Sequence, residues 1–167
     1  MFRTILVPLD GSDLAASALP AAVEMARRFD SRLRLVTVIE TGLASLALGA
    51  NVAAGALTDP AAITTQMDAH VEAAKAYLSA TAEQLAGQGL SAEIEVRGGP
   101  AGDGVVQAAR EANADLIVMS SHGRGGLGRL IFGSVAEHVA RNATMPLLVV
   151  RGKEAIGRRA RQEGARE

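Results

Sequence analysis

Short apolar runs recur along the chain as far as Arg151 and are separated by longer amphipathic stretches. The runs at 4–9, 33–39, 115–120 and 147–151 hold few polar side chains, which is typical of strands covered on both faces of a sheet. Residues 92–97 instead alternate strictly between apolar and charged side chains. This alternation predicts a half-exposed strand at a sheet edge, where charges discourage unwanted strand pairing.

The amphipathic stretches carry apolar residues three or four positions apart, as one face of a helix requires. They span Leu14–Phe29, Pro60 to about Gly87, Ala101–Glu111 and Ser134–Asn142. Ser12 or Asp13 can cap the first of these helices. Because strands and helices alternate throughout, the chain is predicted to be α/β. The prediction is an open, five-stranded parallel sheet with helices on both faces and right-handed crossovers.

The densest group of glycines follows the run at 115–120. Gly123, Gly125, Gly126 and Gly128 come first, and Gly133-Ser134 then opens the next helix. Glycines after a strand let the backbone turn tightly and approach a ligand closely. A helix start presents free N–H groups and a partial positive charge, and together these features form an anion site. The sequence therefore predicts that nucleotide phosphates lie on Gly123 and Gly133–Val135.

Length and composition narrow the function. The 167 residues suit one domain over residues 1–152, and the charged tail at 153–167 is expected to be flexible. A net charge of −1 and an aromatic content of 2% argue against a nucleic-acid partner. The chain has no cysteine, no signal-peptide layout and no apolar run of about 18 residues. We therefore expect a cytoplasmic protein that does not insert into membranes.

Thr41–Thr58 differs from the rest of the chain because it carries no charge and consists mainly of Ala, Leu and Gly. It is interpreted as a mobile loop or short helix over the ligand. A long loop within a compact domain is usually either functional or disordered, and both alternatives stay open here.

Three other groups of residues partly match known binding motifs, but each lacks a feature that its motif requires. Gly123-Arg-Gly-Gly-Leu-Gly128 matches a dinucleotide fingerprint, but it lies late in the chain and lacks the acidic residue expected about 20 positions on. Gly152-Lys153 is followed by Glu154, so no P-loop is present. The three histidines, His70, His122 and His138, are too scattered to form a metal site.

Ser120-x-x-Gly123, nine residues and then Gly133-Ser134 resembles the G-x-x-G, nine residues, G-S or G-T motif of nucleotide-binding universal stress proteins. Similar stretches occur at Ile5–Ser12, Gly99–Ala101 and Asn142–Val150, and the resemblance covers residues 2–151. The first motif glycine of the family is Ser120 in this chain. Serine is tolerable if this position gives the sugar only a backbone contact, whereas its Cβ weakens binding if it collides with the ribose.

The resemblance implies a Rossmann-like fold with strand order 3-2-1-4-5 and an adenine nucleotide, ATP or AMP, as ligand. It implies that the base and ribose contact Pro8, Leu9, Asp10, Val38, Met119 and Ser120, and that the phosphates contact Gly123, Gly133, Ser134 and Val135. Arg124 is a candidate for adding positive charge near the phosphates. The alternative is that its side chain is a solvated surface group. Asp10 is a candidate for a ribose hydroxyl or an Mg²⁺ ion, and the alternative is a turn aspartate in Asp-Gly-Ser.

Leu147–Val150 is fully apolar, and such an edge strand should not be left open. It predicts a homodimer through the last strand, which the resemblance also implies. The favoured function is a regulatory module of the stress response that binds ATP or AMP and acts on an unidentified protein. The alternatives are a slow ATP hydrolase that uses Asp10 and a metal, with His122 as a second candidate, or a dimeric interaction module that binds no nucleotide.

Overall fold

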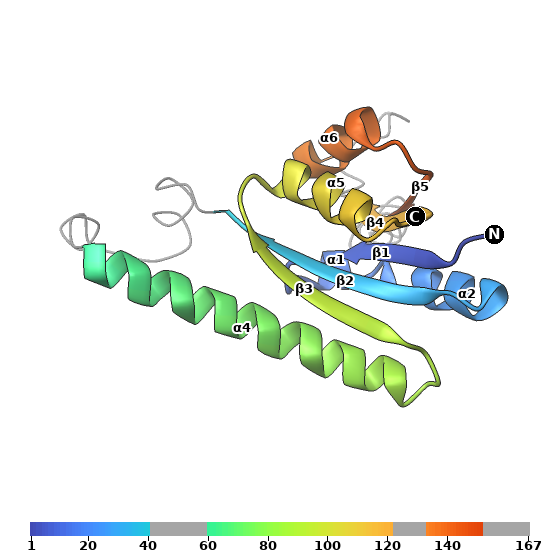
Figure 1. The fold of residues 1–167 in the computed structure, drawn as a ribbon, viewed down its shortest axis with the longest axis horizontal. Helices are drawn as coiled ribbons and strands as arrows, with labels where there is room; N and C mark the ends of the chain where they lie inside the picture. Colours follow the sequence, from blue (N-terminus) through green and yellow to red (C-terminus); the bar gives the residue numbers. More distant parts are fainter. Residues whose placement is uncertain (41–59, 122–132, 152–167) are drawn as a thin grey trace, which may run out of the picture.

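The computed structural model describes residues 1–40, 60–121 and 133–151, and Figure 1 shows their arrangement. Its elements are β1 (Thr4–Pro8), α1 (Asp13–Ala16), α2 (Leu19–Phe29), β2 (Arg32–Ile39), α4 (Pro60–Ala86), β3 (Ala92–Gly98), α5 (Ala101–Glu111), β4 (Leu116–Ser121), α6 (Ser134–Asn142) and β5 (Leu147–Arg151). The five strands form one sheet in the order β3-β2-β1-β4-β5, and every neighbouring pair is parallel. The predicted fold class and strand order are confirmed.

Two apolar cores lie on opposite faces of this sheet because successive strand residues point to opposite sides. In β1, Ile5 packs into the core beneath α2 and α4, whereas Leu6 packs into the core beneath α5 and α6. Figure 1 shows the same division, with α5 and α6 on one face and α2 and α4 on the other. The helices α2, α4, α5 and α6 therefore cover the two faces of the sheet. Within the described ranges, no helix combines the length and apolar character that crossing a membrane requires.

The single helix predicted over Leu14–Phe29 is wrong, because the structure has two helices there, α1 and α2. Ser12 caps α1 by accepting a hydrogen bond from the Ala15 amide at 3.1 Å, as predicted. Pro20 explains the break. Its nitrogen has no hydrogen to donate and its ring crowds the carbonyl four residues earlier, so proline is accommodated only in the first turn of a new helix. The other predicted elements agree with the observed ones to within one or two residues.

The alternating strand β3 lies at the sheet edge, as predicted. Its charged side chains are paired rather than free in solvent. Arg34 of β2 donates to Glu93 and, over 3.1 Å, to Glu95, and Arg97 of β3 donates to Glu111 of α5. These bonds tie the edge strand to its neighbours on one face of the sheet.

The start of β1 is held by Asp115, which immediately precedes β4. Its Oδ2 accepts hydrogen bonds from the backbone amides of Arg3 at 2.8 Å and Thr4 at 3.0 Å. These two bonds, Thr4 first, lower the pKa of the carboxyl group, since they favour its charged form. Asp115 therefore fixes the start of the central strand beside β4, at the opposite end of these strands from their carboxyl ends.

Candidate functional site

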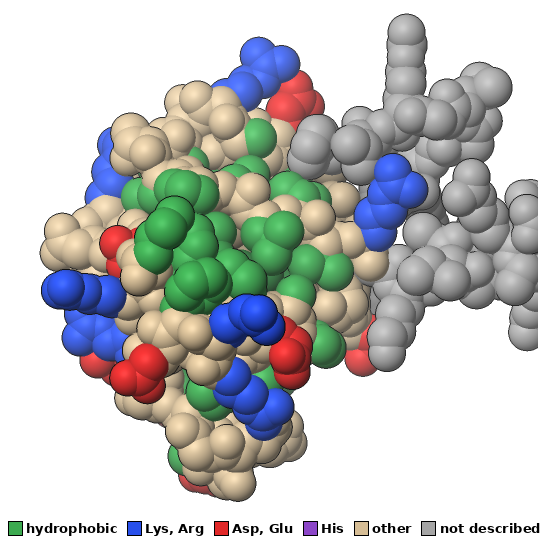
Figure 2. Space-filling model, turned by 90° about the vertical axis from the view of Figure 1, so that its right-hand side faces the viewer, with side chains coloured by type: hydrophobic (Ala, Val, Ile, Leu, Met, Phe, Trp, Pro, Cys, Tyr) green, Lys and Arg blue, Asp and Glu red, His purple; other side chains and the backbone are tan. Residues whose placement is uncertain are grey.

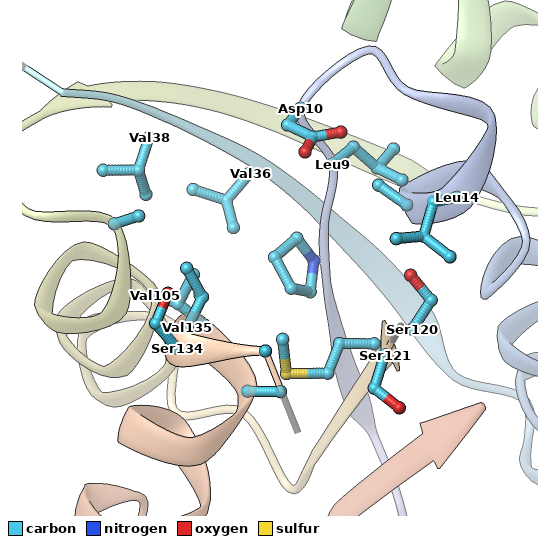
Figure 3. Close-up of a pocket in the computed structure, with 16 residues that line it drawn as sticks. Leu9, Asp10, Leu14, Val36, Val38, Val105, Ser120, Ser121, Ser134 and Val135 are labelled. Carbon is cyan, nitrogen blue, oxygen red and sulfur yellow. The ribbon is translucent and has the colours of Figure 1, made fainter. Parts of the chain in front are cut away.

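A cavity of about 220 Å³ opens at the carboxyl ends of β1, β2 and β4 (Figure 3). From the central strand β1, the chain continues to β2 and β3 on one side of the sheet. It then returns to form β4 and β5 on the other side, so the strand order reverses between β1 and β4. Open parallel sheets bind ligands at such a reversal, because the loops there diverge and leave a crevice. The fold thus places a concave site where its topology favours one.

Every predicted site residue that the structure describes lines this cavity. These residues are Pro8, Leu9, Asp10, Val38, Met119, Ser120, Gly133, Ser134 and Val135. They come from the ends of three strands, the segment that follows β1 and the start of one helix, and the earliest and latest of them are far apart in sequence. Gly123, Arg124, His122 and the segment Thr41–Thr58 lie outside the described residues. The binding role of each residue stays a prediction, but their convergence is a property of the structure.

The backbone leading from β1 into the cavity is fixed to β2. The Leu9 amide donates to the Val36 carbonyl at 2.8 Å, and the buried Thr37 hydroxyl donates to the Leu9 carbonyl, also at 2.8 Å. The backbone N–H and C=O groups of Leu9, a buried residue, therefore both have hydrogen-bond partners. As a result, the following residue, Asp10, starts from a fixed point at the cavity rim.

Asp10 performs the turn role considered from the sequence and also lines the cavity. Its Oδ1 accepts hydrogen bonds from the Ser12 amide at 2.9 Å and the Ser12 hydroxyl at 2.6 Å. Gly11, between them, has a φ of +82°, which glycine adopts without strain. Since Oδ1 is occupied by the turn, Oδ2 is the oxygen best placed for a ligand hydroxyl or a metal ion.

A metal ion would find few protein ligands at this site. Among the described side chains, no group of three or more His, Asp or Glu residues could hold one. Mg²⁺ is commonly held by one or two carboxylates together with substrate phosphates and water. Asp10 fits that limited role, in which the ligand itself would supply most of the metal's contacts.

The start of α6 brings backbone donors that have no partner within the helix to the cavity. Gly133, the N-cap, has an extended conformation, and no side chain caps the helix. The first amide that bonds within the helix is that of Glu137, to the Gly133 carbonyl at 2.9 Å. The amides of residues 134–136 precede it and so have no partner within the helix, and all three residues line the cavity. This end of the cavity is therefore suited to an anion.

A second helix begins nearby, because Ala101, the first residue of α5, also lines the cavity. Its N-cap is Pro100, and the first amide bonding within α5 is that of Gly104, at 2.9 Å from the Pro100 carbonyl. Each helix start carries about half a positive charge. Two such starts at one cavity reinforce each other in attracting a negative group.

The remaining walls are apolar. Val36 and Val38 extend from β2, Leu14 comes from α1, and Val105 of α5 lies near Val135 of α6 (Figure 3). A flat, largely apolar ring can bind between such side chains, while the polar groups at the rim fix its orientation. The cavity therefore combines an apolar part with an anion-binding end.

Several other residues also line the cavity although no sequence motif pointed to them, namely Leu14, Ala15, Val36, Ala101, Val105, Ser121 and Ala136. Periodicity contained a signal for some of them. Val36 lies two residues before Val38 and so points to the same face of β2, and Val105 lies one helical turn after Ala101. Leu14 and Ala15 carried no such signal, because their placement depends on α1 being a separate short helix.

Two glycines of α5 allow close packing behind the cavity. A Cβ at Gly102 would lie 2.6 Å from Cγ of His138 on α6, and a Cβ at Gly104 would lie 2.7 Å from Cγ1 of Val38. Nε2 of His138 is 2.8 Å from Oδ1 of Asp103, although their alignment falls short of a hydrogen bond. Thus α5 approaches both β2 and α6 more closely than bulkier residues would permit.

The sequence pattern of the universal stress protein family matches residues 1–151. A universal stress protein of Methanocaldococcus jannaschii is 30% identical over 151 residues, which cover 90% of this chain and 83% of the relative. The solved structure of the universal stress protein UspA from Lactobacillus plantarum superimposes with a TM-score of 0.70 at 25% identity, over 90% of this chain and 98% of the other.

Two further solved structures with this fold contain nucleotides. One is a universal stress protein in complex with cAMP, with a TM-score of 0.63 at 24% identity over 89% of this chain and 97% of the other. The second is the universal stress protein from Archaeoglobus fulgidus in complex with dAMP, with a TM-score of 0.56 at 22% identity over 89% of this chain and 97% of the other. At these identities the likeness is one of fold.

Proposed function

The chain belongs to the universal stress protein family, and on that premise we propose that it is a regulatory module that binds an adenine nucleotide, ATP or AMP. The ligand occupies the cavity at the carboxyl ends of β1, β2 and β4. A single observation carries the proposal: apolar walls and amides that have no partner within helix α6, the two halves of a nucleotide-binding site, line the same cavity.

Each part of the ligand has a matching part of the cavity. The base lies among Val36, Val38 and Val105, and the ribose lies near Asp10 and Ser120. The phosphates lie at the start of α6, where the amides of Ser134 and Val135 and the Ser134 hydroxyl donate to their oxygens. At about 220 Å³ the cavity is below the roughly 300–1,000 Å³ of typical small-molecule pockets, so a triphosphate extends from its mouth.

The nucleotides found in two relatives of the same fold support this assignment. Both cAMP and dAMP contain adenine and one phosphate. Adenine with at least one phosphate is also what the apolar walls and the α6 amides of this chain suit. Asp10 would hold an Mg²⁺ ion, which would supply positive charge to neutralise the phosphates.

Regulation needs a surface as well as a ligand, and β5 supplies one. Its Leu148 side chain is 36% exposed although it is a large apolar residue, and β5 is an edge strand. Figure 2 looks onto the side of the molecule where β5 and the N-terminus lie, and hydrophobic side chains gather there within a charged rim. We propose that a second copy of the chain covers β5, since pairing would remove an open strand edge.

Mass spectrometry of protein purified without added ligand tests nucleotide binding directly, and calorimetry with ATP and AMP ranks the two. The double variant Gly133→Val, Ser134→Glu should bind ATP at least about 10-fold more weakly, because losing even one charge-assisted hydrogen bond costs roughly 1.5–3 kcal/mol. Ser134→Ala is the matched control, since it removes only the hydroxyl. Undiminished ATP affinity in the double variant, or no heat with either nucleotide in the wild type, would overturn the proposal.

Ser120→Gly restores the glycine that the family motif has at this position. Ser120 lines the cavity and its backbone pairs with β5, so its Cβ projects from a fixed strand. A gain in ATP affinity on substitution means that the serine Cβ crowds the ribose. An unchanged affinity means that this position contributes only backbone.

A further inference from the structure

The first two turns of α5 contain Gly102 and Gly104. Glycine is a poor helix former, because it loses more conformational freedom than any other residue and leaves the backbone exposed. A glycine inside a helix therefore points to a packing requirement. For Gly104 that requirement is visible: a Cβ would lie 2.7 Å from Cγ1 and 2.8 Å from Cγ2 of Val38.

Val38 cannot easily yield to such a contact. Its branched Cβ restricts the side chain to few rotamers. Its backbone is held in the sheet, where Val38 pairs with Arg97 of the edge strand β3. Gly104 lies in a helix that packs against β2, so the strand and the helix fix both ends of the contact.

The other side of Val38 faces the cavity (Figure 3). Gly104 itself does not line the cavity. Since the two methyl groups of Val38 occupy the space where a Cβ of residue 104 would lie, adding that carbon moves Val38 toward the cavity. The ring-binding part of the site then narrows, because Val36 and Val105 close it on neighbouring sides.

We propose that Gly104 is a specificity-determining residue of this cavity: it leaves Val38 the room to stand back, so that the cavity accepts the two fused rings of a purine. Gly104 acts through Val38 and does not touch the ligand, so it is a positioning residue. This inference rests on the proposed function, in which Val38 borders the base. Beyond that function, Gly104, a residue that does not line the cavity, sets the width of the part of the cavity that holds the base.

Calorimetric titration of four variants with ATP and CTP tests the proposal. Gly104→Ala should weaken ATP binding by about 10-fold or more, the usual effect of one misplaced carbon in an apolar pocket. CTP carries a single ring, so its affinity should fall less and the ATP-to-CTP preference should shrink. Gly87→Ala is the matched control, because its added Cβ would meet only backbone oxygens at 3.6 Å. It should leave both affinities unchanged.

The double variant Gly104→Ala, Val38→Ala supplies the rescue. Val38→Ala alone has its own effect on the base site, so it is the reference for the double variant. If Gly104 acts through Val38, the double variant should bind ATP within about threefold of Val38→Ala, since the two substitutions are then strongly coupled. This comparison holds even if Gly104→Ala alone fails to fold, because the smaller side chain at 38 removes the collision.

Methyl NMR spectra of the ligand-free proteins provide a second readout. The Val38 methyl resonances should shift in Gly104→Ala and stay in place in Gly87→Ala. Gly104→Ala binding ATP like the wild type, a double variant that binds ATP more than about threefold more weakly than Val38→Ala, or unshifted Val38 methyls would each overturn the inference. If the wild type binds neither nucleotide, the proposed function fails, and the base-specificity claim fails with it. Wild-type binding combined with an unaffected Gly104→Ala variant overturns the inference alone.

Discussion

The hydroxyl of Thr37 donates a hydrogen bond of 2.8 Å to the carbonyl of Leu9, and the bond is buried. It joins β2 to the segment that leads from β1 into the cavity. A carbonyl left without a partner in such a place costs free energy, because water cannot replace the lost donor. The position of Asp10 at the rim therefore depends on a side chain that does not itself line the cavity.

Replacing Thr37 with valine should lower the free energy of unfolding by about 1–2 kcal/mol and weaken nucleotide binding. Urea unfolding followed by circular dichroism measures the first effect, and calorimetry measures the second. Thr81→Val is the control, because the Thr81 hydroxyl bonds to a helix carbonyl, that of Tyr77, at 2.9 Å. A Thr37 variant that loses no more stability than this control would show that the bond is dispensable.

Asp115 makes stability depend on pH. The amides of Thr4 and Arg3 lower its pKa in the folded protein. Its contribution to stability is thus fully present above the unfolded-state pKa, roughly 4, and is lost as pH falls through the lower folded-state value. At pH 7, Asp115→Ala should be less stable by about 1 kcal/mol, a figure reduced for partial solvent exposure.

The stability difference between the wild type and Asp115→Ala should shrink as pH falls below about 4. Chemical unfolding across that pH range provides the test. Asp115→Asn keeps an acceptor oxygen without the charge, so it should lie between the two proteins at pH 7. A constant difference at every pH would mean that the charge of Asp115 is irrelevant to these bonds.

Asp10 distinguishes a binding module from a slow hydrolase. Its Oδ1 is engaged by the amide and hydroxyl of Ser12, and we assign its Oδ2 to a ligand hydroxyl or a metal ion rather than to an attacking water. We expect single-turnover ATP hydrolysis to change less than about threefold in Asp10→Ala and in His122→Ala, since proton transfer by a positioned group typically contributes 100-fold or more. A large loss in either variant would favour the hydrolase.

The two sheet edges offer a matched pair for testing the dimer. Leu148 on β5 is 36% exposed, and Ile94 on β3 is 37% exposed. Leu148→Arg should raise the dimer dissociation constant by about 30-fold, equivalent to roughly 2 kcal/mol for a central interface residue. Ile94→Arg should not affect it. Sedimentation velocity over a concentration series separates the two, and a monomeric wild type would contradict the proposal outright.

Periodicity was sufficient to predict the strands because each strand carries its own signal, whereas the strand order followed from the family resemblance. The apolar runs and the alternating run at 92–97 gave the strands, and β3 proved to be an edge strand as its charges indicated. The break between α1 and α2 was missed because the apolar spacing continues across Pro20, whose effect on the backbone outweighs the pattern.

The candidate site was partly predictable for a related reason. Glycine clusters and helix starts are recognisable in a sequence, so Gly133 and Ser134 could be predicted to line the site. Val38, at the end of a strand, was predicted from the family resemblance. Gly104 could not be found this way. Its relation to Val38 arises only when α5 packs on β2, and no local pattern encodes the distance between them.

The cavity walls come from α1 and β1 near one end of the chain and from α6 near the other. A molecule bound there would contact regions that come from distant parts of the polypeptide and would hold them together reversibly. Its binding energy would add to the resistance of the entire sheet against unfolding, by an amount that grows with the logarithm of ligand concentration. The lifetime of the folded protein would then track how much ligand its surroundings contain.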